Sequence, residues 1–218
     1  MPSVKHVSNL RAEQAAATRS RILEAARQVF EERGFAGARI EDVGRAAGVA
    51  VPTVYKVFTN KRNLLAEVVD RAMTGASYGG TVEDQEWWKE QLSEPDPRRQ
   101  LRLIARNARQ IYERAGSVLE VVRASAPLDP GIAAMWNGIS SERLRRSRRT
   151  ARRLVSRVGR DRVRFRSEEL AMTLWSLTGP ELFTTHVGEG RSADQYERWL
   201  GDVLEASILL TPSRPVRR

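Results

Sequence analysis

Few residues of this chain could carry acid–base, nucleophilic or metal chemistry. The chain has no cysteine, which excludes disulfides, thiolate nucleophiles and thiolate metal sites. Its two histidines, His6 and His186, are far apart in the sequence, which argues against a metal site. Adjacent acids such as Glu31–Glu32 are typical of a solvated helix surface, and no G-x-S-x-G run or phosphate-binding glycine loop is present. We therefore expect no enzymatic activity, no metal and no cofactor.

A different chemistry is offered by the short segment PTVYKVF. Val54, Val57 and Phe58 are spaced to face a small core, which leaves Thr53, Tyr55 and Lys56 pointing elsewhere. A helix this short is not stable alone, so hydroxyls and a cation on its outer face need a functional explanation.

The elements around this segment predict how it is positioned. TRSRILEAARQVFEERG predicts an amphipathic helix with Thr18 as N-cap and Gly34 as C-cap. IEDVGRAAGV predicts a second, shorter helix that ends at Gly48, and Pro52 suits the first turn of the third. NKRNLLAEVVD then begins another helix. This order is that of a helix-turn-helix followed by a linker helix, and it indicates DNA binding.

The run AGVAVPTVYKVFTNKRNLLAEVV resembles the DNA-binding signature of the TetR family of bacterial transcriptional regulators. The matching residues are Ala47, Gly48, Val49, Thr53, Tyr55, Phe58, Lys61, Leu64 and Leu65. Two positions depart from the pattern: Ala50 and Arg39 stand where that family usually has Ser or Thr caps. A lost cap costs about 1 kcal/mol, so the third helix is expected to be less well fixed.

The resemblance implies roles for six residues at the DNA. The hydroxyls of Thr53 and Tyr55 and the ammonium of Lys61 would bind phosphates. Lys56 would read a guanine edge, and Val51 or Pro52 would meet a thymine methyl. Two alternatives stay open here: Tyr55 could cover the core, and Lys61 with its neighbour Arg62 could form an ordinary solvated face.

Composition is consistent with a polyanionic partner. The 218-residue chain has a net charge of +10, with 33 Arg and 4 Lys against 27 acids. No apolar run approaches the roughly 20 residues that span a bilayer, and the N-terminus lacks the apolar core of a signal peptide. We expect a cytoplasmic protein with no membrane contact.

Beyond residue 64 the chain shows helical periodicity and no alternating strand pattern. The predicted fold is all-α, with an N-terminal three-helix helix-turn-helix domain joined by a linker helix to a larger helical-bundle domain. The expected parts are a flexible arm (1–17), the DNA-binding domain (18–60), a ligand-binding and dimerisation domain (61–211) and a tail (212–218). The tryptophans Trp87 and Trp88 are expected in a polar loop, and Gly116 is expected to interrupt a long helix.

The arginine-rich run 143–166 holds twelve arginines, and the acids set against them are Asp161 within the run and Glu142 just before it. Such a run could bind nucleic acid a second time, line the pocket of an anionic ligand, or form a solvated helix face. The sequence leaves these three alternatives open.

The segment LWSLTGPELFTTHVGEGRSADQYERWLGDVL resembles the C-terminal end of many actinobacterial TetR-type regulators, in which two helices build the dimer. Its apolar helices could instead be buried inside one subunit. Pro180 should kink or split the first of them. The predicted dimerisation residues are Leu174, Leu182, Phe183, Tyr196, Trp199, Leu200 and Val203.

By the same resemblance, the middle helices would enclose a pocket for a small-molecule inducer. The predicted wall residues are Met73, Trp87, Trp88, Tyr112, Met135, Trp136 and Trp175. Any one of them could instead be an ordinary core residue. The predicted function is a homodimeric repressor that binds a palindromic double-stranded DNA operator and is released by ligand. The alternatives are a helical ligand-binding or interaction protein without operator binding and a helical enzyme.

Overall fold

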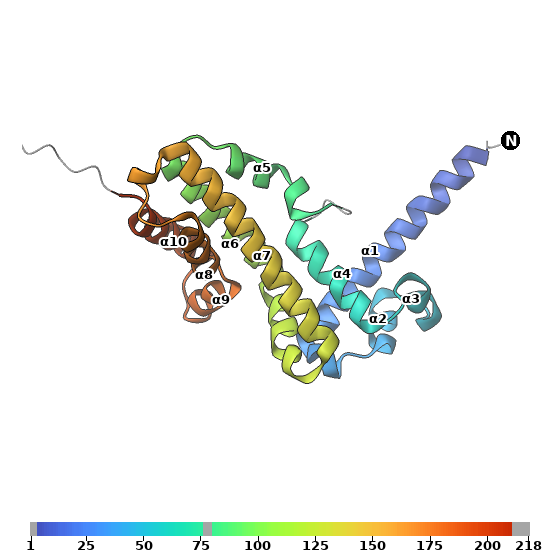
Figure 1. Ribbon diagram of the computed structural model, residues 1–218. Coiled ribbons are helices and arrows are strands. Elements are labelled where there is room, and N and C mark those ends of the chain that lie inside the picture. Colours follow the sequence, from blue (N-terminus) through green and yellow to red (C-terminus); the bar gives the residue numbers. More distant parts are fainter. Residues whose placement is uncertain (1–3, 76–79, 211–218) are drawn as a thin grey trace, which may run out of the picture. The chain divides into compact units, whose positions relative to one another are not determined.

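The computed structural model describes residues 4–75 and 80–210, without the side chains of residues 4–10. The described chain is helical, as predicted, and its β-type pairing is limited to one isolated bridge between Val163 and Leu209. The helices, traced in Figure 1, are α1 (Val4–Gly37), α2 (Ile40–Ala47), α3 (Val51–Val57), α4 (Lys61–Thr74), α5 (Glu86–Ser93), α6 (Pro97–Ser125), α7 (Pro130–Val158), α8 (Ser167–Leu177), α9 (Pro180–Gly188) and α10 (Ala193–Ile208). None of these described helices is long and apolar enough to cross a membrane.

The chain divides into two compact units. The first unit takes residues 1–72 and 117–136, and the second takes residues 73–116 and 137–218. The domain boundary expected at residue 60 stays a prediction, and the expected tail, 212–218, lies outside the described residues.

The core of the first unit is built from the apolar faces of α1 to α4. Ile22 and Phe30 on α1 are fully buried, as are Val54 on α3 and Leu64 on α4. Helix α2 packs against both α1 and α3, with Val43 at its buried face. Because α3 has only seven residues, this packing rather than its own propensity keeps it helical.

Three local predictions are corrected by the structure. Helix α1 begins at Val4, where a loose arm was expected and Thr18 was expected to act as the N-cap. The run AEQAAA explains this, because good helix formers extend an existing helix at little cost. Trp87 and Trp88 lie on helix α5 rather than in a loop. Helix α6 passes through Gly116 without a break, since burial of Ala115 and Leu119 outweighs the roughly 1 kcal/mol cost of a helical glycine.

The core of the second unit includes the last three helices. Helix α10 packs against α8 and α9, and Leu170, Tyr196 and Leu200 are fully buried. Helix α8 ends at Leu177 and α9 begins at Pro180. The predicted split at this proline is therefore confirmed, and the missing N–H of Pro180 costs nothing in the first turn of α9.

Candidate functional site

The turn between α2 and α3 is made by glycine. Gly48 has φ 66° and ψ 37°, the left-handed conformation that ends α2. The N–H of Val49 then donates to the carbonyl of Gly44 at 2.9 Å. A Cβ on Gly44 would lie 3.0 Å from the Val49 carbonyl oxygen, so this position also favours glycine. The sequence analysis identified Gly48 and missed Gly44.

Helix α3 turns its apolar side inward and its polar side to solvent. Val54 is fully buried, whereas the Tyr55 side chain is 49% exposed. Lys56 and Pro52 are exposed, and Thr53 and Val51 are partly exposed. The exposure of Tyr55 does not fit its alternative role as a cover for the core. As the sequence suggested, neither Ala50 nor Arg39 provides a side-chain cap.

Lys61 has partners within its own unit. Its ammonium donates to the carbonyls of Phe35 at 2.7 Å and Ala38 at 3.0 Å, and lies 4.5 Å from the centre of the Phe35 ring. Partial burial lowers the pKa of Lys61, although Asp129 acts in the opposite direction. Two of its three N–H donors bind the end of α1, which leaves one for another acceptor. Its predicted phosphate contact stays a prediction.

The start of α4 is held by two residues that the sequence analysis did not identify. The Asn60 side-chain oxygen accepts from the Asn63 N–H at 2.9 Å and so caps α4. Asp129 pairs with Arg62 at 2.9 Å and also accepts the N–H groups of Gly131 and Ile132 at the start of α7. Asn60 is a recognisable N-cap in the sequence, but the distant partner of Arg62 is not.

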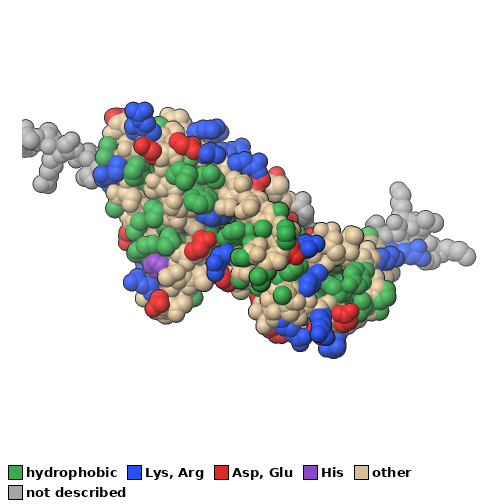
Figure 2. All heavy atoms as spheres, turned by 60° about the horizontal axis from the view of Figure 1, so that its bottom comes forward, with side chains coloured by type: hydrophobic (Ala, Val, Ile, Leu, Met, Phe, Trp, Pro, Cys, Tyr) green, Lys and Arg blue, Asp and Glu red, His purple; other side chains and the backbone are tan. Residues whose placement is uncertain are grey.

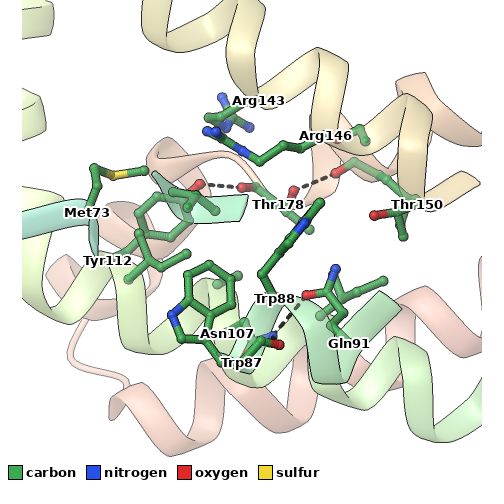
Figure 3. Close-up of a pocket in the computed structure, with 16 residues that line it drawn as sticks. Met73, Trp87, Trp88, Gln91, Asn107, Tyr112, Arg143, Arg146, Thr150 and Thr178 are labelled. Carbon is green, nitrogen blue, oxygen red and sulfur yellow. Dashed lines mark hydrogen bonds between the residues drawn. The ribbon is translucent and has the colours of Figure 1, made fainter. Parts of the chain in front are cut away.

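The second unit contains a cavity of about 90 Å³, shown in Figure 3. Of the seven predicted wall residues, Met73, Trp87, Trp88 and Tyr112 line it. Met135 and Trp136 are not among its lining residues, and they belong to the first unit. Trp175 does not line it either, and its indole N–H donates to the Ser140 carbonyl at 3.3 Å. The remaining lining residues are Val82, Gln91, Ile104, Asn107, Ala108, Ile111, Arg143, Arg146, Ser147, Thr150, Leu174 and Thr178.

One side of this cavity is cationic. Arg143 and Arg146 reach it from α7, with their guanidinium groups near each other and across the cavity from Asn107 and Gln91 (Figure 3). The Arg146 side chain is only 15% exposed, and burial lowers its pKa despite the nearby Glu83 carboxylate. Arg143 donates to the Trp175 carbonyl at 2.7 Å. The sequence analysis left an anion pocket open for the arginine run without assigning these two residues to it.

The N-terminal residues match a family model. Residues 22–68 match the model for bacterial regulatory proteins of the tetR family. This stretch contains the glycine turn and the outward face of α3 described above. Residues 22–68 therefore form a domain of the tetR type.

Solved structures share the TetR fold across most of the chain. NalD, the secondary repressor of the MexAB-OprM multidrug efflux pump in Pseudomonas aeruginosa, has a TM-score of 0.68 at 21% identity, covering 90% of this chain and 98% of NalD. A protein from Saccharomonospora viridis described as a transcriptional regulator, in complex with choline, has a TM-score of 0.67 at 23% identity, covering 88% and 98%. PfmR, a TetR-family regulator from Thermus thermophilus, has a TM-score of 0.62 at 19% identity, covering 85% and 97%. No curated protein matches the chain.

The predicted TetR-type dimerisation residues divide into two groups. Leu174, Phe183, Tyr196 and Leu200 are buried within the single chain, and a dimer contact for them stays a prediction. The Tyr196 ring packs edge-on against Phe183, with centroids 5.1 Å apart. The residues that keep partly exposed surface are Leu182, Trp199 and Val203.

The partly exposed residues have apolar neighbours on the same helices. Met172 on α8 and Val187 on α9 are each 41% exposed, and Figure 2 shows groups of hydrophobic side chains at this end of the chain. On α10, Trp199 and Val203 are one turn apart and therefore share a face. Asp202 and Glu205 lie on another face of α10, where they pair with Arg102 of α6.

The other arginines of residues 143–166 differ in their environment: some form ion pairs and others are exposed to solvent. Arg148 pairs with Glu168 at 2.7 Å, and Arg145 pairs with Glu142. Arg149, Arg152 and Arg153 are exposed. The run is therefore partly a solvated helix face, while Arg143 and Arg146 belong to the cavity.

Proposed function

We propose that this protein is a cytoplasmic TetR-family repressor that binds a palindromic operator as a homodimer and is released by a small molecule. The observation that carries the proposal is the outer face of α3. Tyr55 and Lys56 are exposed on a seven-residue helix within the matched tetR domain, while Val54 on the same helix is fully buried. A polar, cationic face on so short a helix suits the major groove.

The proposed contacts follow from the chemistry of each exposed group. Thr53 and Tyr55 would donate hydroxyl protons to phosphates and fix the position of α3. Lys56 would donate to a guanine edge, and the apolar Val51 or Pro52 would meet a thymine methyl.

A homodimer would present two copies of α3 to one face of the duplex. Their spacing would be about 34–36 Å, one turn of DNA, which makes the operator palindromic. The partly exposed surface of Leu182, Trp199 and Val203 is the proposed interface, because it is apolar and not used by the core of one chain.

Release would act through the linker helix α4, which carries both Lys61 and the cavity residue Met73. A ligand releases DNA only if it binds the DNA-incompetent state more tightly. NalD supports the repressor role, since that structural neighbour is a repressor. Choline, bound in the other neighbour, would fit this cavity poorly, because the described lining residues include two guanidinium groups and no carboxylate.

A gel shift on the DNA beside the protein's own gene tests operator binding. We expect Tyr55→Phe to weaken binding to all sequences alike, because one phosphate contact is lost. Lys56→Ala should relax the preference at one base position, at a cost of about 1–3 kcal/mol for the preferred base. Lys89→Ala, which removes an exposed lysine from α5, is the matched control.

Affinities should be compared at several salt concentrations. If the protein does not bind this DNA even at low salt, the alternative of a ligand-binding protein without operator binding remains. Binding that Tyr55→Phe and Lys56→Ala leave unchanged would mean that α3 does not contact the DNA as proposed.

A further inference from the structure

We propose that the cavity of the second unit binds a small organic carboxylate that also carries a hydrogen-bond donor, held between the arginine pair of α7 and the side chain of Asn107. The proposal rests on the proposed function only in taking this ligand to be the releasing molecule. Binding itself can be measured without DNA.

The arginine pair is the first argument. Arg143 and Arg146 bring two positive charges to one cavity wall, where burial and, to a smaller extent, the charge of Arg143 lower the pKa of Arg146. No carboxylate is among the described residues that line the cavity. Glu83 pairs with Arg146 at 3.6 Å, and the charge of Arg143 remains close to that of Arg146. A bound anion would relieve the repulsion, and a guanidinium matches a carboxylate with two parallel hydrogen bonds.

The second argument is an acceptor without a donor. The Asn107 amide nitrogen donates to the Gln91 side-chain oxygen at 2.9 Å and to the Trp87 carbonyl at 3.4 Å. Because the Trp87 carbonyl can only accept, these contacts fix the orientation of the amide. The Asn107 side-chain oxygen is buried and has no partner among the described residues. A buried acceptor left unpaired is costly, so a ligand hydroxyl or amine here would gain affinity.

The third argument is size and lining. A water needs about 10–15 Å³ of such space, so a 90 Å³ cavity has room for several waters or for one small organic molecule. Met73, Trp87 and Tyr112 supply apolar and aromatic surface for the body of the molecule. The chemistry expected is that of a single-ring or short-chain carboxylate with a hydroxyl or amine away from the acid group.

Isothermal titration calorimetry on the full chain, without DNA, tests the ligand class. The probes are benzoate, 3- and 4-hydroxybenzoate, 4-methoxybenzoate, benzamide and benzylamine. We expect benzoate to bind at least about tenfold more tightly than neutral benzamide, and benzylamine not to bind. One of the hydroxybenzoates should bind more tightly than 4-methoxybenzoate, which lacks the donor proton.

Variants locate the site. Arg143→Gln and Arg146→Gln should each weaken binding of the best carboxylate by about tenfold or more. Arg149→Gln, which changes an exposed arginine on the same helix, is the matched control and should bind as the unchanged protein does. Far-ultraviolet circular dichroism shows whether each variant is folded.

The proposal would be overturned if benzoate and benzamide bound with equal affinity. It would also be overturned if the Arg143→Gln and Arg146→Gln variants both bound the carboxylate as tightly as the unchanged protein. Absence of binding by every carboxylate at millimolar concentration would overturn it too. A protein that binds the carboxylate but no DNA would instead contradict the proposed function and leave the ligand class standing.

Discussion

Lys61 shows how one side chain can serve the fold and a proposed site together. Its ammonium binds the carbonyl of Phe35, in the last turn of α1, and that of Ala38, directly after the helix. Lysine near a helix C-terminus stabilises carbonyls that have no helical partner. The same ammonium retains one donor for a DNA phosphate, so the structural and DNA-binding interpretations do not exclude each other.

Lys61→Met should therefore have two separable effects. Loss of the two carbonyl contacts should lower the free energy of unfolding by about 1 kcal/mol, because the group is only partly buried. Loss of a phosphate contact should reduce the slope of log affinity against log salt by about 1. Thermal unfolding and gel shifts measure the two effects, with Lys89→Met as control. A lower melting temperature with an unchanged salt slope would make Lys61 a structural residue only.

Tyr112 and Tyr196 show why a tyrosine's role cannot be assigned by type. The Tyr112 hydroxyl donates to the Thr178 carbonyl at 2.7 Å beside the cavity. The Tyr196 hydroxyl is buried without a partner among the described residues, and burial raises its pKa. The resemblance to TetR-type C-terminal helices implied a dimer contact for Tyr196, whereas its side chain is buried within the single chain.

At the scale of elements, the start of α7 is tied to the start of α4. Asp129 precedes α7, accepts two of its first N–H groups and pairs with Arg62 on α4. The Arg62 hydrogen bonds, and then the Ile132 N–H, hold the pKa of Asp129 below its ordinary value. Because the native state favours the Asp129 carboxylate, these contacts stabilise the fold above about pH 4. This stabilisation is lost as pH falls through the lowered pKa.

Asp129→Asn should thus lower the melting temperature between about pH 5 and 7, where the charge is present in the unchanged protein. The difference between variant and unchanged protein should shrink as pH falls below about 4, because the unchanged protein then loses the same interaction. Circular dichroism melts from about pH 7 to pH 3 test this, with the exposed Asp161→Asn as control. A difference that stays constant over that whole range would mean that the effect does not come from the Asp129 charge.

At the scale of the whole molecule, part of the apolar surface of α8 to α10 is left outside the core of one chain. Trp199 is partly exposed, and its ring lies 4.1 Å from that of His186, centre to centre. Val203 continues the same face of α10. Such surface suits association with a second copy.

Trp199→Glu and Val203→Glu should each shift the protein from dimer to monomer, because an unpaired charge would be buried in the interface. Operator affinity should fall with the dimer, since two half-sites no longer bind together. Sedimentation velocity measures the oligomeric state, with Ser156→Glu on exposed α7 surface as control. If both variants stayed folded and dimeric, the dimer interface would not include Trp199 and Val203.

The sequence by itself determined the elements near α3. The glycine at position 48, Pro52 and the spacing of apolar residues predicted the helix-turn-helix, and the family match agrees. These signals are local: a left-handed turn needs glycine, and helical periodicity shows which side chains face inward. The break at Pro180 was predictable for the same reason.

Only the tertiary structure decided which distant residues meet. Arg62 pairs with Asp129, which lies far from it in the sequence. Arg143 and Arg146 line one cavity together with Asn107, which belongs to a different helix. The sequence made Trp136 and Trp175 as plausible for the cavity as Trp87 and Trp88. The cavity is lined by Trp87 and Trp88, whereas Trp136 and Trp175 are not among its lining residues. Periodicity shows that a face is apolar, but whether the core, a ligand or a second subunit covers that face depends on how the helices pack.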